Sequence, residues 1–137
     1  MLVVRAGTAR VGLPLASALE TLRPLPCAPL PHSPPWVTGA SVIRGAPTPV
    51  VDLGQLLGGA PAPPTRLVTV RAGARVVALA VQEVLGIRTV ARAAGLPPVL
   101  AGSDERVAAL SALDAQLLLV LREGCLLEAC ATEAPAG

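Results

Sequence analysis

The sequence has no phenylalanine and no tyrosine, and Trp36 is its only aromatic residue, although 53% of its 137 residues are hydrophobic. The core must therefore be built from valine, leucine, isoleucine and alanine. A chain of this length can form one domain with a real core, or two small barrels that share one. The lack of aromatic side chains also removes the stacking surface that many nucleic-acid-binding proteins use.

Lysine is absent as well, so that all eleven basic residues are arginine. Because alanine, glycine and proline are abundant, we attribute this to the codon bias of a GC-rich genome rather than to function. The formal net charge is only +2, and the arginines form no basic cluster along the chain. This pattern argues against nucleic acid as a partner.

Long apolar segments free of charge and proline are also missing. The uncharged stretch between Arg23 and Arg44 contains six prolines, which no membrane-spanning helix would carry. Met1 is followed directly by residues 2–5, without the basic region, apolar region and cleavage site of a secretory signal. We therefore expect a cytoplasmic protein with no direct membrane insertion.

Residues suited to catalysis or metal binding are sparse. Cys27, Cys125 and Cys130 lack the C-x-x-C spacing of a zinc or redox site, so we expect three reduced thiols. The single histidine, His32, lies in a proline-rich stretch without a second ligand at metal spacing. Residues 54–59 lack the Lys-Ser/Thr of a phosphate-binding loop. We predict no enzyme activity, no cofactor and no metal.

The clearest local signal is the stretch Gly39 to Leu53. β-branched residues on both sides of Gly45 predict two strands joined by a turn. Pro47 and Pro49 are two residues apart, so their missing N–H groups fall on one edge, which cannot pair continuously. Arg44 precedes the turn glycine, where a guanidinium would be displayed at a mouth. A solvated turn arginine without a binding role is the competing interpretation.

In the first third of the chain, residues 2–5 and 9–13 read as a strand hairpin around Gly7. Apolar residues then follow at i, i+3, i+4 and i+7 between Leu15 and Leu22, which predicts a two-turn helix. Glu20 lies off that apolar stripe, where a carboxylate is typically solvated. The residues from 24 to 35 are expected to form a stiff, proline-rich loop.

Beyond a proline-rich linker at 60–64, further strands are predicted. Residues 66–71 and 75–84 should form a second hairpin, in which Val76–Val81 is apolar on both faces and therefore buried. The remaining segments are a loop at 89–104, a strand pair at 107–113 and 116–121, a short helix at 123–131 and a fraying end at 132–137.

A weak internal repeat divides the chain. Val70-Arg71-Ala72-Gly73 repeats Val4-Arg5-Ala6-Gly7, and Leu79 matches Leu13 at the same offset of 70 − 4 = 66 residues. A repeat at half length suggests two similar β units. We predict a single domain over 1–137, with a first unit at 1–60, a second unit at 65–112, and a C-terminal strand and short helix within 113–131.

The segment Gly39-Ala40-Ser41-Val42-Ile43-Arg44-Gly45, followed by Pro49-Val50-Val51-Asp52-Leu53, resembles the core signature of CheW-like domains, the adaptors of bacterial chemotaxis arrays. In that family Gly-Val-x-Asn-Leu-Arg-Gly precedes Pro-x-x-Asp-Leu at similar spacing. The resemblance extends upstream to residues 13–15 and Glu20, and downstream to Val77–Val84. It implies a mainly β fold of two small SH3-like five-stranded β-barrels packed together with short helices, and a groove between them.

The resemblance also implies a function without chemistry. Such an adaptor couples chemoreceptors to a CheA-type histidine kinase, whose regulatory domain would bind one face. The cytoplasmic tip of a chemoreceptor would bind the groove, formed here by Ala18, Glu20, Arg44 and Gly45.

Two other functions stay open. Val42 and Gly54 depart from the asparagine and arginine common at these positions in the family, which favours a divergent member that binds only one partner, in a motility or other chemosensory pathway. The third possibility is an unrelated β-barrel module that binds peptides or nucleic acid.

Overall fold

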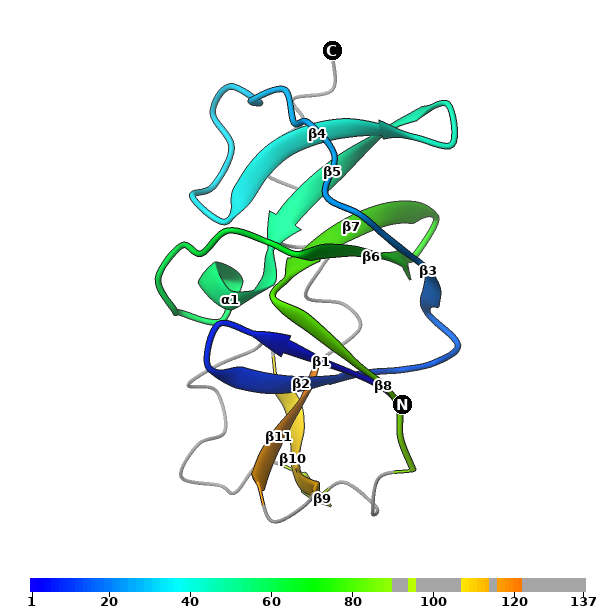
Figure 1. Ribbon diagram of the computed structural model, residues 1–137, viewed down its shortest axis with the longest axis vertical. Helices are drawn as coiled ribbons and strands as arrows, with labels where there is room; N and C mark the ends of the chain where they lie inside the picture. The colour runs from blue at the N-terminus through cyan, green and yellow to red at the C-terminus, as the bar shows by residue number, and fades with distance from the viewer. Residues whose placement is uncertain (90–93, 96–106, 114–115, 122–137) are drawn as a thin grey trace.

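The computed structural model describes residues 1–89, 94–95, 107–113 and 116–121, which form a mainly β structure of two sheets (Figure 1). The six-stranded sheet has the order β8-β1-β2-β11-β10-β9 and the five-stranded sheet has the order β3-β6-β7-β5-β4. The fold class predicted from the sequence is confirmed. The elements are β1 (Leu2–Ala6), β2 (Ala9–Leu13), β3 (Ala18–Leu22), β4 (Val37–Ile43), β5 (Ala46–Asp52), α1 (Leu53–Leu56), β6 (Arg66–Ala72), β7 (Arg75–Val81), β8 (Glu83–Ile87), β9 (Ala94–Gly95), β10 (Val107–Leu113) and β11 (Gln116–Leu121).

The internal repeat corresponds to two equivalent hairpins. β1 pairs with β2 up to Ala6↔Ala9, and β6 pairs with β7 up to Ala72↔Arg75. Each hairpin turns at a glycine in the left-handed region, since Gly7 has φ 62° and Gly73 has φ 64°. Glycine adopts this conformation without the steric cost that a side chain brings. The two hairpins predicted from the strand signals are confirmed, one in each sheet.

The helix predicted between Leu15 and Leu22 is wrong, because residues 18–22 form strand β3. This strand pairs antiparallel with β6, with Ala18 opposite Val70 and Leu22 opposite Leu67. A two-turn helix is too short to be stable without tertiary contacts. As a strand, the segment instead satisfies its backbone groups against an edge that β6 would otherwise leave open.

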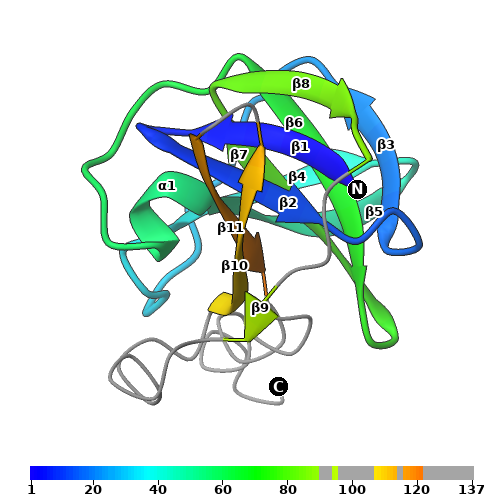
Figure 2. The same cartoon turned by 90° about the horizontal axis from the view of Figure 1, so that it is seen from below.

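The two sheets do not follow the predicted division into units at 1–60 and 65–112. β8 pairs with β1, and β11 pairs in parallel with β2, so the six-stranded sheet draws strands from both halves of the chain (Figure 2). The five-stranded sheet likewise joins β3, β4 and β5 to β6 and β7. Among the described residues, the edge strands of neither sheet pair with each other, so neither sheet closes by main-chain hydrogen bonds.

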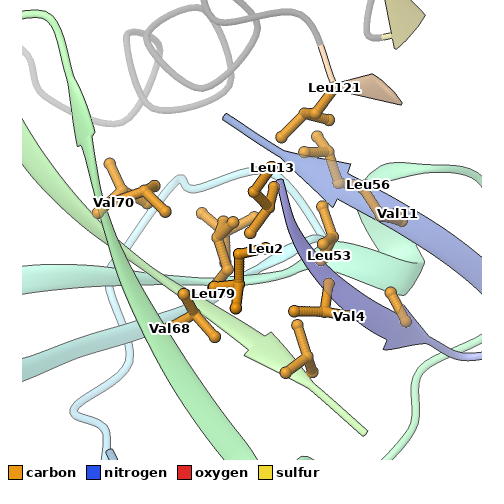
Figure 3. Close-up of a cluster of buried hydrophobic side chains, with 14 of the residues drawn as sticks. Leu2, Val4, Val11, Leu13, Leu53, Leu56, Val68, Val70, Leu79 and Leu121 are labelled. Atoms are coloured by element: carbon orange, nitrogen blue, oxygen red, sulfur yellow. The ribbon is translucent and has the colours of Figure 1, made fainter. Parts of the chain in front are cut away.

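The main core lies between the two sheets. Buried side chains from β1, β2, α1, β6, β7 and β11 meet there, and ten of them are labelled in Figure 3. Val77, Leu79 and Val81 of β7 belong to this cluster, whereas Ala78 and Ala80 pack in a second cluster with Ile43, Val50 and Leu67. β7 is therefore apolar on both faces, as predicted, although Val76 at its start is only half-buried.

The prolines of β5 shape the edge of that strand. β5 pairs with β4 from Ala46 to Val51, but it pairs with β7 only from Val50 to Asp52. Pro47 and Pro49 lie in the part that β7 leaves unpaired, which agrees with the prediction that this edge cannot pair continuously.

The remaining predictions on secondary structure and cysteines can be compared with the structure only where their residues are described. β10 and β11 match the predicted strand pair, and residues 60–64, the predicted linker, contain no regular secondary structure. Cys27 is a free thiol. The predicted helix at 123–131, the fraying end, Cys125 and Cys130 lie outside the described residues, as does most of the predicted loop at 89–104.

Candidate functional site

The turn between β4 and β5 displays Arg44. Ile43 pairs with Ala46 across the turn, which leaves Arg44 and Gly45 as its two central residues. Their φ angles are 54° and 76°, so both residues are left-handed, as in a type I′ hairpin turn. The first position of this turn favours asparagine, aspartate or glycine, and other L-residues pay roughly 1–2 kcal/mol there. Arginine at this position therefore suggests a role beyond turn formation.

Arg44 forms a two-pronged ion pair with Glu20 of β3. The Arg44 Nε atom donates to Glu20 Oε1 at 3.0 Å, and its NH2 group donates to Oε2 at 2.6 Å. This fork-to-fork geometry fixes the plane of both groups. The side chain of Arg44 is 77% exposed and that of Glu20 is 25% exposed. The two residues, which the family resemblance places in one groove, are thus in direct contact.

The pair shifts the protonation of both partners. Hydrogen bonding to Arg44 is the main effect and lowers the pKa of Glu20 below its ordinary value. Burial opposes it to a lesser extent, and the positive charge of Arg44 adds the smallest, lowering, contribution. The same contact raises the pKa of Arg44. Glu20 is therefore a carboxylate at neutral pH, and the pair is fully charged.

A hollow of about 320 Å³ lies beside the ion pair. Its walls are mainly apolar, with side chains from all five strands of the five-stranded sheet or their turns: Leu19, Glu20, Ile43, Arg44, Ala46, Thr48, Thr69 and Val76. Thr69 holds the backbone of Glu20 in place, because its Oγ1 atom accepts from Glu20 N at 3.1 Å and donates to Glu20 O at 3.3 Å. The site thus combines an exposed cation with an apolar recess.

The four predicted site residues lie in one region, on β3 and at the β4–β5 turn. Ala18 is a half-buried residue of β3, two positions before Glu20, and Gly45 is exposed next to Arg44. The hollow that contains Glu20 and Arg44 belongs to the five-stranded sheet alone. The hollow itself thus lies on one sheet, and the binding of a partner at these four residues stays a prediction.

Sequence reasoning missed Leu19, Thr69 and Val76. Thr69 lies opposite Glu20 in the β3–β6 pairing, and this relationship is invisible once residues 15–22 are interpreted as a helix. The sequence of β3, Ala-Leu-Glu-Thr-Leu, does not alternate between apolar and polar residues, so it carries no local signal of a strand.

Other chemistry has little support in the described part of the chain. Within it, no group of three or more histidine, cysteine, aspartate or glutamate residues is placed to hold a metal ion. His32 is exposed in the loop before β4. None of the helices in these residues has the length and apolar character needed to cross a membrane.

Comparisons with known proteins identify the family. The model of the CheW-like domain matches residues 1–130. The chain therefore belongs to the CheW-like domain family. The structure is similar to the crystal structure of the scaffolding protein TtCheW from Thermoanaerobacter tengcongensis, with a TM-score of 0.77 over 98% of this chain and 95% of TtCheW. Their sequences are 20% identical, so this likeness concerns the fold.

Two curated relatives carry closer sequence similarity. The chain is 38% identical to Protein FrzA of Myxococcus xanthus over 101 residues, which are 72% of this chain and 63% of FrzA. It is 32% identical to the probable chemotaxis protein CheW of Rhizobium etli over 93 residues, 66% of this chain and 60% of the relative. In both cases the match spans less than two thirds of the relative's length.

Proposed function

We propose that this CheW-like chain is a non-enzymatic, cytoplasmic adaptor that couples chemoreceptors to a CheA-type histidine kinase. The observation that carries the proposal is the forked Glu20–Arg44 ion pair beside an apolar hollow in a chain of this family. The names of its relatives, a chemotaxis protein and a scaffolding protein, point in the same direction. Its interaction with partners would consist of binding alone.

The site has the chemistry to receive a receptor tip. Arg44 carries five N–H donors and uses two of them on Glu20, so the remaining donors can meet a carboxylate or carbonyl of the partner. Leu19 and Val76 line the hollow, where an aliphatic side chain of a helical hairpin would be buried. Charge would fix the orientation of the partner, and the apolar contact would add affinity.

The regulatory domain of the kinase would bind a different face of the adaptor. Simultaneous binding would hold receptor and kinase in a fixed geometry, and this geometry would be the output of the protein. Because Arg44 serves only one of the two partners under this proposal, the two binding events can be separated by mutation.

A second candidate is an adaptor that binds only one of these partners. Gly54, one of the two departures from the family pattern, is buried in α1 against the β1–β2 turn. A Cβ atom at Gly54 would lie 3.3 Å from Gly7 N and 3.4 Å from Ala6 C, so an arginine there would require this turn to move. The other departure, Val42, is 71% exposed. Of the two departures, only Val42 therefore changes a surface that a partner could contact directly. Because the chain belongs to the CheW-like family, it is not an unrelated peptide- or nucleic-acid-binding module.

The experiment measures the affinity of the wild type and of Arg44→Glu for a receptor tip and for a CheA-type regulatory domain. We expect the receptor affinity to fall and the kinase affinity to stay unchanged. Arg66→Glu is the matched control, because Arg66 is also an exposed arginine of the five-stranded sheet but does not line the hollow. Unchanged receptor affinity in Arg44→Glu would contradict the site, and wild-type binding to a single partner would favour the second candidate.

A further inference from the structure

A second, larger cleft opens at the other end of β5 from the Arg44 turn. Its volume is about 510 Å³, within the range of roughly 300–1,000 Å³ typical of ligand pockets. β5 has seven residues, and a strand of this length spans roughly 20 Å. In Figure 1, α1, which directly follows β5, lies on the opposite side of the molecule from the β4–β5 turn. The two hollows have no lining residue in common, so the cleft is a separate site.

The walls of the cleft are mostly apolar and rich in proline. Its lining residues are Pro24, Leu25, Cys27, Pro35, Val37, Thr38, Val50, Asp52, Gln55, Pro61, Ala62, Pro63, Pro64, Leu67 and Ala80. Among the described residues that line the cleft, Asp52 is the only charged one, and none is an arginine or a histidine. An anionic ligand would therefore meet a carboxylate without any compensating positive charge.

Asp52 is buried and incompletely hydrogen-bonded. It is only 7% exposed, and its Oδ1 atom accepts from Gln55 N at 3.2 Å, which caps α1. The described residues donate no hydrogen bond to its Oδ2 atom, which is not sealed from solvent and can be reached from the cleft. A carboxylate offers about four acceptor positions, and a buried one is costly unless it is paired. The cleft thus presents an acceptor that its own walls do not satisfy.

We propose that this cleft binds a basic side chain, arginine or lysine, presented by a partner protein. The aliphatic stem would lie against the proline-rich walls, and the cationic end would reach Asp52, as long basic side chains do when their stems are buried. A neutral apolar side chain would fill the same volume but leave the carboxylate unpaired, which is the less favourable outcome. Charge complementarity therefore selects a cation on an aliphatic stem.

The test uses two short peptides, acetyl-Ala-Arg-Ala-amide and the same peptide with citrulline, the neutral isostere of arginine. Each is titrated at constant ionic strength into the ¹⁵N-labelled protein and followed by NMR. We expect the arginine peptide to shift the amide signals of Thr38, Asp52 and Gln55 and to bind at least tenfold more tightly than the citrulline peptide. Equal binding of both peptides, or shifts at Glu20 and Arg44 instead, would overturn the proposal.

Two variants locate the contact. Asp52→Asn removes the charge but keeps a good helix cap, because asparagine and aspartate are equally favourable N-caps. It should lose at least tenfold in affinity for the arginine peptide, whereas Glu83→Gln, which neutralises an exposed acid of β8, should lose nothing. Ala62→Phe keeps Asp52 but adds a large side chain at another lining position of the cleft, and it should also abolish binding. Wild-type affinity in either Asp52→Asn or Ala62→Phe would show that the cleft is not the site.

Discussion

Glu20 and Arg44 join the two opposite edges of one sheet. Glu20 lies on β3, the first strand in the order β3-β6-β7-β5-β4, and Arg44 lies at the end of β4, the last. Their side chains nevertheless form two hydrogen bonds of 3.0 and 2.6 Å. The sheet must curve strongly to bring its edges so close, as the right-handed twist of strands allows. The ion pair thus connects the edges where main-chain pairing does not close the sheet.

Arg44→Asn should separate turn stability from binding. Asparagine is well suited to the first position of a type I′ turn, so the variant should recover part of the roughly 1–2 kcal/mol that a left-handed arginine costs. It also loses an exposed ion pair, which is typically worth about 0.2–1 kcal/mol. We expect the free energy of unfolding to change by less than about 1 kcal/mol, while receptor binding falls as in Arg44→Glu. Denaturant unfolding combined with a binding assay checks both, and a large loss of stability would show that the ion pair is mainly structural.

Arg44→Gln should raise the pKa of Glu20. The contact with Arg44 lowers this pKa, whereas burial acts in the opposite direction. A carboxyl whose pKa is lower in the folded than in the unfolded state stabilises the fold above the unfolded pKa, and this contribution is lost as the pH falls through the folded pKa. The wild-type protein should therefore lose the contribution below the ordinary glutamate value of 4.5. In Arg44→Gln the opposing effect of burial remains.

NMR titration of the side-chain carboxyl carbons measures this shift directly. Glu83 is a suitable internal control, because it is exposed on β8 in the other sheet. An unchanged Glu20 titration would mean that the ion pair is not formed in solution.

Local patterns predicted most of the strands of this fold. The Gly7 and Gly73 turns, the Arg44–Gly45 turn and the two-faced β7 all follow from glycine placement and runs of β-branched residues. These signals are local, since each depends on residues within about ten positions of one another. They predict hairpins, but they contain no information on which hairpins share a sheet.

Pairing between strands that are distant in the chain determines the features that local sequence patterns did not predict. β3 is a strand because β6 offers it an edge, although its apolar spacing also fits a short helix. Likewise, β8 pairs with β1 and β11 with β2, across most of the chain. The family resemblance alone predicted that Glu20 and Arg44 share one site. The contribution of Thr69 and the hollow beside the ion pair could be recognised only from the strand register in the structure.

Gly39→Ala should be far more damaging than Gly45→Ala. Gly39 has φ +152°, and a Cβ atom there would lie 2.3 Å from the carbonyl oxygen of Ala28. That oxygen accepts from Ala40 N at 2.9 Å, so a shift of the loop would also disturb this bridge between the loop and β4. Strain and overpacking together should cost roughly 2–5 kcal/mol.

Gly45→Ala is the control, because residue 45 also has a positive φ angle but an added Cβ atom there would meet no neighbouring atom. Gly45 has φ +76°, but nothing lies within 4 Å of a Cβ atom placed there. Gly45→Ala should therefore cost only about 1 kcal/mol. The midpoints of urea unfolding of both variants provide the measurement, and equal losses would mean that the loop before β4 does not pack against Gly39 in solution.

Leu79→Asp should unfold the protein. Leu79 is fully buried at the centre of β7, in the cluster that both sheets share (Figure 3). An unpaired carboxylate there costs several kcal/mol, a large part of the roughly 5–15 kcal/mol that stabilises a typical domain. Val42→Asp introduces the same carboxylate at a valine that is 71% exposed on β4, so it should melt close to the wild type. Circular dichroism melts of the pair measure the difference. Cooperative, wild-type melting of Leu79→Asp would show that the two sheets do not share a core at β7.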